Sequence, residues 1–221
     1  MPVHLFEFIR TCVIIFIMAF SYLEKKAFKN GFKVIAGADE AGRGSLAGPV
    51  AAAVVKSRTV PIFRNCPQIK DSKQLSAKQR ELIFERIIQE PKIDWKVSFI
   101  WPSVIDRINI LQATKLAWKR CLKKFDSQPD FLFIDGNQGI EGLKIEQQTV
   151  IKGDQKIFLV SLASIIAKVS RDRLMERLSI KYPEYNFIQH KGYGTKLHLK
   201  NLKKFGPCEI HRKSFRPICK I

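Results

Sequence analysis

Residues 33–55 read KVIAGADEAGRGSLAGPVAAAVV, two apolar runs separated by a glycine-rich turn. The runs at 33–38 and 49–55 each have the length and apolar content of a buried β-strand. The turn between them is short enough for an antiparallel pair. Asp39 and Glu40 stand where the first strand enters the turn. The sequence therefore predicts two paired strands with two carboxylates at one end.

Outward from this stretch, the chain alternates helices with single strands. Ser76 and Gln79 form a capping-box signature ahead of an apolar-periodic helix that ends near Glu90. Further strands are expected at 95–100, 131–134 and 144–151, and further helices at 102–125, 159–178 and 195–205, the last ended by Gly206 and Pro207. This order predicts an α/β fold with a mixed central sheet flanked by helices and a helical C-terminal extension.

The composition indicates a folded protein with a strong excess of positive charge. Hydrophobic residues make up 46% of the 221 residues and charged residues 27%, which allows a core and argues against disorder. The formal net charge of +19 indicates a polyanionic partner, with nucleic acid first and an anionic membrane surface second. The five cysteines are widely spaced and form no zinc-site pattern, so we expect reduced thiols and a cytoplasmic protein.

The N-terminus has an apolar run at 13–20 that lies outside the strand–helix pattern. The run has eight residues, and a spanning helix needs about 20, so we expect no membrane anchor. It is either a short helix packed on the core or sequence upstream of the true start, and we favour Met18 as the initiator. We therefore divide the chain into an N-terminal extension, 1–32, whose residues 1–17 precede the favoured start, and a catalytic domain with a C-terminal helical region, 33–221.

Acidic residues are scarce, and four of them are predicted to follow strands. Asp39 and Glu40 end the first strand, Asp135 ends the strand at 131–134, and Asp154 follows the segment at 144–151. Ligands bind at strand ends in open α/β sheets, and clustered carboxylates suit Mg²⁺ or Mn²⁺, with two ions permitting in-line attack at phosphorus. Two alternatives stay open. Asp135 and Asp154 each have the context of a turn residue, and neighbours on a regular strand face opposite ways, so Asp39 and Glu40 share a site only if the strand ends or bends there.

The ordered motifs resemble those of the ribonuclease HII family, a type 2 ribonuclease H. They run from 34 to about 217 and comprise Asp39-Glu40-Ala41-Gly42-Arg43-Gly44, Asp71-Ser72-Lys73-Gln74-Leu75-Ser76, Asp135-Gly136-Asn137, Lys152-Gly153-Asp154, the helical stretch 163–172, His190-Lys191-Gly192-Tyr193-Gly194-Thr195 and His211-Arg212-Lys213-Ser214-Phe215.

The resemblance implies a ribonuclease H-like fold with Asp39, Glu40, Asp135 and Asp154 as catalytic, metal-binding carboxylates. It implies cleavage of RNA in RNA–DNA hybrids and a cut 5′ of ribonucleotides embedded in duplex DNA, leaving a 3′-hydroxyl and a 5′-phosphate. The expected substrate-binding residues are Gly42, Arg43, Gly44, Lys73, Lys168, Arg171 and Tyr193. Lys168 and Arg171 are three residues apart and share a helix face, which favours a phosphate-binding face.

Other assignments remain possible from the sequence. Arg43, Lys73, Lys168 and Arg171 could be solvated surface charges, and Tyr193 a loop aromatic packed on the core. His190 and His211 suit structural hydrogen bonds and are assigned to neither metal nor proton transfer. Rival functions are a ribonuclease HIII, a transposase-like nuclease, a non-catalytic nucleic-acid binder and a membrane-surface protein. We expect a monomer.

Overall fold

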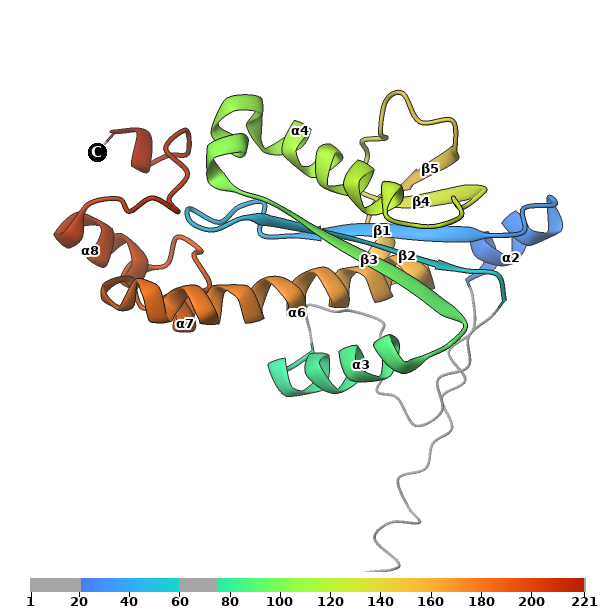
Figure 1. Ribbon diagram of the computed structural model, residues 1–221, viewed down its shortest axis with the longest axis horizontal. Coiled ribbons are helices and arrows are strands. Elements are labelled where there is room, and N and C mark those ends of the chain that lie inside the picture. The colour runs from blue at the N-terminus through green and yellow to red at the C-terminus, as the bar shows by residue number, and fades with distance from the viewer. Residues whose placement is uncertain (1–20, 60–74, 221) are drawn as a thin grey trace, which may run out of the picture.

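The computed structural model describes residues 21–59 and 75–220 (Figure 1). The apolar run at 13–20, the candidate start at Met18, and Lys73 with most of its motif lie outside the described residues. No helix among the described residues has both the length and the apolar character needed to cross a membrane.

A five-stranded mixed sheet forms the centre of the molecule. Its order is β3-β2-β1-β4-β5, with bounds β1 Ile35–Ala41, β2 Val50–Ser57, β3 Ile93–Ile100, β4 Phe131–Asp135 and β5 Glu146–Val150. The pairs β1–β2 and β2–β3 are antiparallel, whereas β1–β4 and β4–β5 are parallel. The predicted antiparallel pair and the mixed sheet are confirmed.

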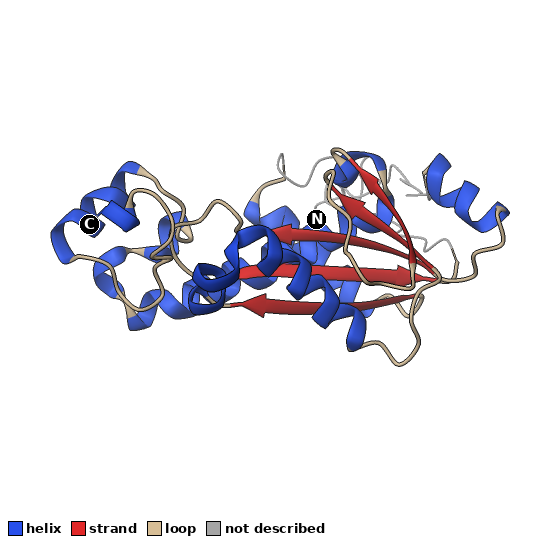
Figure 2. Ribbon diagram, turned by 90° about the horizontal axis from the view of Figure 1, so that it is seen from above, coloured by secondary structure: helices blue, strands red, loops and turns tan. Residues whose placement is uncertain are grey.

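Helices cover both faces of this sheet. The bounds are α2 Tyr22–Lys29, α3 Ala77–Gln89, α4 Pro102–Lys123, α5 Gly153–Lys156, α6 Phe158–Lys181, α7 Phe187–His190 and α8 Lys196–Phe205, with 3₁₀ turns at Pro183–Tyr185 and Ile218–Lys220. Helix α4 lies on one face, and α6 with α3 on the other (Figure 1). The helices after α6 extend beyond the end of the strands (Figure 2), as predicted for the C-terminal region.

Residue alternation in β1 assigns each side chain to one of two cores. Ile35 packs with α6 residues, and so do Phe131 and Phe133 of β4. Ala36 and Ala38 pack instead with α4 residues. Because side chains on a strand alternate between faces, Asp39 falls on the α6 face and Glu40 on the α4 face.

The helix boundaries follow from local chemistry, with one exception. The predicted capping box of α3 is present, since Ser76 Oγ accepts from Gln79 N and Gln79 Oε1 accepts from Ser76 N. Helix α4, however, is interrupted at Asn109, which has φ 63°. Its ψ of 167° is extended, and its Oδ1 accepts from Gln112 N at 3.1 Å, so Asn109 caps the helix that restarts after it.

Helix α2, in the segment predicted as an N-terminal extension, is tied to the start of α6 through Glu24. This buried carboxylate accepts from Phe158 N at 3.0 Å and Leu159 N at 2.8 Å, the first amides of α6. It also accepts from Ser21 N in the capping box of α2. Glu24 therefore caps two helices, and α2 shares the core of the sheet through Ala27.

Candidate active site

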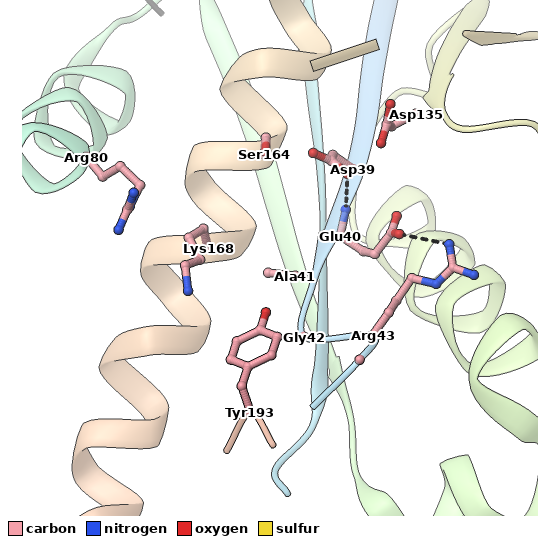
Figure 3. A pocket seen from close by; sticks show the side chains of 11 residues that line it. Asp39, Glu40, Ala41, Gly42, Arg43, Arg80, Asp135, Ser164, Lys168 and Tyr193 are labelled. Atoms are coloured by element: carbon pink, nitrogen blue, oxygen red, sulfur yellow. Dashed lines mark hydrogen bonds and ion pairs between the residues drawn. The ribbon is translucent and has the colours of Figure 1, made fainter. Parts of the chain in front are cut away.

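A pocket of about 530 Å³ opens where β1 runs into the glycine-rich loop, between the end of β4 and the middle of α6 (Figure 3). Most of the predicted site residues line it: Asp39, Glu40, Gly42, Arg43, Gly44, Asp135, Lys168 and Tyr193. Asp154 and Arg171 do not line it, and Lys73 lies outside the described residues. The sequence reasoning missed three lining residues, which are Ala41, Arg80 and Ser164.

The strand does not end or bend at Asp39 and Glu40. It continues to Ala41, which pairs with Ala51 of β2. The two side chains therefore face opposite ways, Asp39 toward Ser164 of α6 and Glu40 toward Arg43, whose Nη1 lies 3.2 Å from Glu40 Oε1 (Figure 3). Both still reach the pocket, because the pairing of β1 with β4 stops at Ala38 and leaves this end of the strand open on that side.

Asp135 brings a third carboxylate to the same end of the sheet. It is the last residue of β4, the strand parallel to β1, and it lies on the α6 face with Asp39. Its Oδ1 accepts from Gly153 N at 2.7 Å, which ties β4 to the segment that carries Asp154. Asp154 is 2% exposed and lies in the short helix α5, not directly at the end of β5, which finishes at Val150.

The neighbouring carboxylates make Asp39 costly to ionise. Burial first, and then the negative charges of Glu40 and Asp135, hold the pKa of Asp39 well above its usual range. Trp118 Nε1 donates to the Asp39 carbonyl oxygen at 3.1 Å and Glu40 N to the Asp39 carboxylate at 2.7 Å, so the residue is held in place. A buried group under this repulsion is stabilised by a cation.

The donor set suits a hard divalent ion, since every candidate ligand is a carboxylate oxygen. Within residues 21–59 and 75–220, no three His, Cys, Asp or Glu side chains are grouped closely enough to hold an ion as they stand. The chemistry of the residues fits a metal centre.

Positive side chains surround the acidic end. Lys168 Nζ pairs with Asp172 at 2.9 Å and lies 5.5 Å from the centre of the Tyr193 ring. Tyr193 directs its hydroxyl toward the carboxylates, and Arg80 reaches the pocket from α3 (Figure 3). Ser164 lies in the stretch 163–172 that carries the family resemblance, so the sequence could have indicated it as a site residue. Arg80 had none, because only the packing of α3 against α6 brings it here.

Arg171 does not form the expected phosphate-binding face with Lys168. It is 0% exposed, and its guanidinium donates to the carbonyls of Ala47 at 3.1 Å, Pro49 at 2.9 Å and Lys191 at 2.9 Å. Lys168 and Arg171 are neighbours, as their spacing predicted, since both lie near the Tyr193 ring. The Arg171 side chain, however, points into the protein interior. Arg171 supports the pocket from behind.

Gly42 is required by this buried arginine. Its φ is +89°, and a Cβ there would lie 2.7 Å from Arg171 Cζ and closer still to Nε. By contrast, a Cβ on Gly44 would meet nothing within 4 Å. The two glycines of the motif therefore differ, since an added Cβ would clash at Gly42 and would enter open space at Gly44.

A second buried arginine, Arg212, holds the same loop and was not assigned from the sequence. It donates to the carbonyls of Gly42 at 2.7 Å, Arg43 at 2.7 Å and Gly48 at 3.0 Å. Burial, and then the positive charge of Arg171, lowers the pKa of Arg212 to about 9. The two guanidiniums fix the backbone of the glycine-rich loop by hydrogen bonds to its carbonyls.

The fold and the site define a class: a hydrolase of ribonuclease H-like fold with clustered carboxylates at the end of its central strands. The ribonuclease HII family model matches residues 36–218, and the chain belongs to this family of endoribonucleases. Ribonuclease HII of Endomicrobium trichonymphae is 49% identical over 195 residues, which cover 88% of this chain and 91% of that protein.

Two solved structures show the same fold. The ribonuclease H2 from Pyrococcus horikoshii OT3 has a TM-score of 0.66 and 30% identity, covering 85% of this chain and 96% of that one. Bst-RNase HIII in complex with Mn²⁺ has a TM-score of 0.57 and 18% identity, covering 88% of this chain and 70% of that one. Ribonuclease H activity on RNA–DNA hybrids follows from membership of the family.

Proposed function

We propose that this enzyme cuts duplex DNA on the 5′ side of an embedded ribonucleotide, as well as the RNA strand of hybrids, and leaves a 3′-hydroxyl and a 5′-phosphate. The observation that carries the proposal is one pocket in which Asp39, Glu40 and Asp135 lie beside the Gly42–Gly44 loop and the Tyr193 hydroxyl. The residues proposed to bind metal and those proposed to bind substrate thus line one pocket, in a protein of charge +19.

Mg²⁺ or Mn²⁺ is the proposed cofactor, held by Asp39, Glu40, Asp135 and Asp154. The support is the all-carboxylate donor set and the raised pKa of Asp39; the solved Bst-RNase HIII complex contains Mn²⁺. Two such ions, when bound, activate the attacking water and stabilise the leaving oxygen. Ser164 and the Glu40 amide hold the Asp39 carboxylate in position.

The substrate roles rest on what each group can offer. The open space at Gly44 lets a nucleotide approach the backbone of the loop. The Tyr193 hydroxyl faces the carboxylates and is suited to contact the 2′-hydroxyl, the group that distinguishes RNA from DNA. Arg43, Arg80 and Lys168 supply positive charge for phosphates around the scissile bond. Lys73 stays a predicted phosphate contact.

A labelled DNA duplex with a single ribonucleotide tests this function. The protein is incubated with the duplex and Mg²⁺ or Mn²⁺, beside Asp39→Asn and an all-DNA duplex. We expect cleavage 5′ of the ribonucleotide, none of the all-DNA duplex, and a loss of at least 100-fold in Asp39→Asn, because a buried ligand charge is removed. A cut only within runs of several ribonucleotides would refute single-ribonucleotide recognition.

Thermal unfolding with and without Mg²⁺ tests the metal assignment apart from activity. Because Mg²⁺ is proposed to bind the native state, the melting temperature of the parent should increase as the Mg²⁺ concentration increases. In Asp39→Asn the rise should shrink, because one ligand charge is gone and the repulsion on Glu40 and Asp135 is relieved. An equal Mg²⁺ response in both proteins would show that Asp39 does not hold the ion.

A further inference from the structure

Three buried histidines lie behind the loop that carries Tyr193. His198 is 0% exposed, His211 1% and His190 6%, and none of them lines the pocket. The rings of His190 and His198 stack with centroids 4.4 Å apart, and Phe187 meets all three rings. The proposed reaction uses none of these imidazoles, so their hydrogen bonds need a separate account.

The hydrogen bonds of His211 and His198 form a chain with one possible direction. At one end, Cys208 N donates to His211 Nδ1 at 2.9 Å, so this nitrogen carries no proton. The proton of neutral His211 is then on Nε2, which lies 3.1 Å from His198 Nε2 and donates to it. His198 therefore carries its proton on Nδ1, which donates to the Tyr193 carbonyl oxygen at 2.9 Å. A backbone donor at one end and a backbone acceptor at the other leave no second arrangement of neutral rings.

Both histidines are neutral in this chain for a physical reason. Burial lowers the pKa of His198 to about 4 and that of His211 to about 4. A proton added to His198 would set two Nε2–H donors against each other at 3.1 Å, and a proton added to His211 would set its Nδ1–H against Cys208 N–H at 2.9 Å. The environment therefore maintains the tautomers that the hydrogen bonds require.

His190 holds the residue before Tyr193. Gly192 N donates to His190 Nδ1 at 3.2 Å, and His190 Nε2 lies 2.9 Å from the Tyr185 carbonyl, to which it donates. Gly192 O in turn accepts from Leu46 N of the glycine-rich loop at 2.8 Å. The backbone on both sides of the Tyr193 side chain is thus tied to imidazoles, and through Gly192 to the loop that carries Arg43.

We propose that His198 and His211 are positioning residues that set the place of the Tyr193 ring over the carboxylates through the chain Cys208 N–His211–His198–Tyr193 O. The proposal rests on the proposed role of Tyr193 in reading the ribonucleotide. The Tyr193 carbonyl also accepts from Thr195 N at 2.8 Å, which alone would leave the peptide free to tilt about one hydrogen bond. The second donor, from His198, fixes its direction.

Two substitutions at one position separate this role from simple filling of the core. The amide of His198→Asn stands near the Nδ1 position and retains a donor for the Tyr193 carbonyl. The amide of His198→Gln stands near the Nε2 position and retains the contact to His211 but not that donor. Both lose the stacked ring, so both should unfold at a lower temperature than the parent.

We expect kcat/KM on the single-ribonucleotide duplex to fall about tenfold in His198→Gln and less than about threefold in His198→Asn, the range of one neutral hydrogen bond. Phe187→Leu is the matched control, because it loosens the same cluster and leaves the chain intact; it should lower the melting temperature with kcat/KM unchanged. Equal losses in the Asn and Gln variants would overturn the proposal.

A double-mutant cycle with Tyr193→Ala tests whether the effect passes through Tyr193. In the Tyr193→Ala background, His198→Gln should cost less than about twofold, because the ring it positions is absent. A full tenfold cost there would show that His198 acts elsewhere. If Tyr193→Ala alone leaves cleavage unchanged, the proposed role of Tyr193 fails, which is a different result from failure of the chain.

Nitrogen-15 NMR of the imidazoles in the parent protein tests the chain without any variant. We expect His198 as the Nδ1–H tautomer, and His211 and His190 as Nε2–H tautomers. An Nε2–H tautomer at His198 would leave the Tyr193 carbonyl without its imidazole donor and would refute the proposal.

Discussion

At Gly37 the central strand β1 lies directly against the backbone of α6. Gly37 lies two residues before Asp39, and a Cβ there would come within 2.7 Å of the Leu159 carbonyl oxygen and closer still to the Leu159 carbon and Val160 nitrogen. Ordinary Cβ contacts are 3.4–4 Å. The obstacle is helix backbone, which cannot rotate away as a flexible side chain can. In Gly37→Ala, strand and helix must therefore separate by about 1 Å.

The cost of this separation follows from what α6 buries. Leu159, Val160, Leu162 and Ala163 are all fully buried, so a shift of the helix disturbs packing along its first two turns. Overpacking of a tight core costs about 1–3 kcal/mol and occasionally more, and we expect about 3 kcal/mol here. The entropy gain on replacing glycine, about 0.4–1 kcal/mol, does not offset it. For a chain of this size the melting temperature should fall by about 6–12 °C.

Activity should fall further than stability alone explains. Strand β1 carries Asp39 and α6 carries Ser164 and Lys168, so the shift separates parts of one pocket. A misplacement of about 1 Å can cost on the order of 100-fold in rate. The assays are scanning calorimetry and cleavage of the single-ribonucleotide duplex at 25 °C, where the variant is still folded. Gly44→Ala, whose Cβ meets nothing, is the stability control. A Gly37→Ala protein that melts within about 2 °C of the parent would refute the reasoning.

Two further predictions concern buried titratable groups. Glu24→Ala should destabilise the protein by about 2–4 kcal/mol in urea unfolding, because it leaves the first amides of α6 without acceptors. Glu24→Gln keeps one acceptor oxygen and should destabilise the protein less. Equal losses of stability in the two variants would show that the carboxylate does not cap α6. His198 and His211, with pKa values lowered from 6.5 to about 4, bind protons only in the unfolded chain over that interval. The contribution of these two histidines to the free energy of unfolding should be fully present above pH 6.5 and fall by on the order of 3 kcal/mol per histidine as the pH falls to 4. Urea unfolding at several pH values measures this fall, and it is done in Asp39→Asn because the raised pKa of Asp39 changes stability with the opposite sign. A free energy of unfolding that does not change between pH 6.5 and 4 would contradict the prediction.

The sequence predicted what local chemistry determines. The capping box at Ser76, the strand pair around the glycine-rich turn and the α/β order depend on neighbours in the chain, and the structure has them. The break of α4 at Asn109 was missed, since the apolar spacing runs through it. The break depends on the positive φ of Asn109 and on the hydrogen bond from Gln112 N to its side chain. The continuation of β1 past Glu40 was missed as well, because its cause is pairing with Ala51 and Ala52.

The candidate site was predictable as a set of residues but not as an arrangement. The strand-end argument brought Asp39, Glu40 and Asp135 together, because neighbouring strands determine where their ends meet. It left open whether Asp39 and Glu40 face opposite ways, and only the pairing of β1 up to Ala41 decides that they do. The same limit applies to Arg80, whose presence in the pocket depends on tertiary packing between helices.

The positive charge shows this limit most clearly, because sequence counts charges and cannot place them. Two of the basic residues, Arg171 and Arg212, are fully buried and bind backbone carbonyls in place of phosphates. Their charges nevertheless contribute to the electrostatic potential at the proposed substrate-binding surface. They lie directly behind the loop that borders the pocket, in surroundings that screen charge less than water does. The two arginines thus have two roles. Their hydrogen bonds hold the shape of the loop, and their charges place positive potential beneath the surface where a phosphate backbone is proposed to bind.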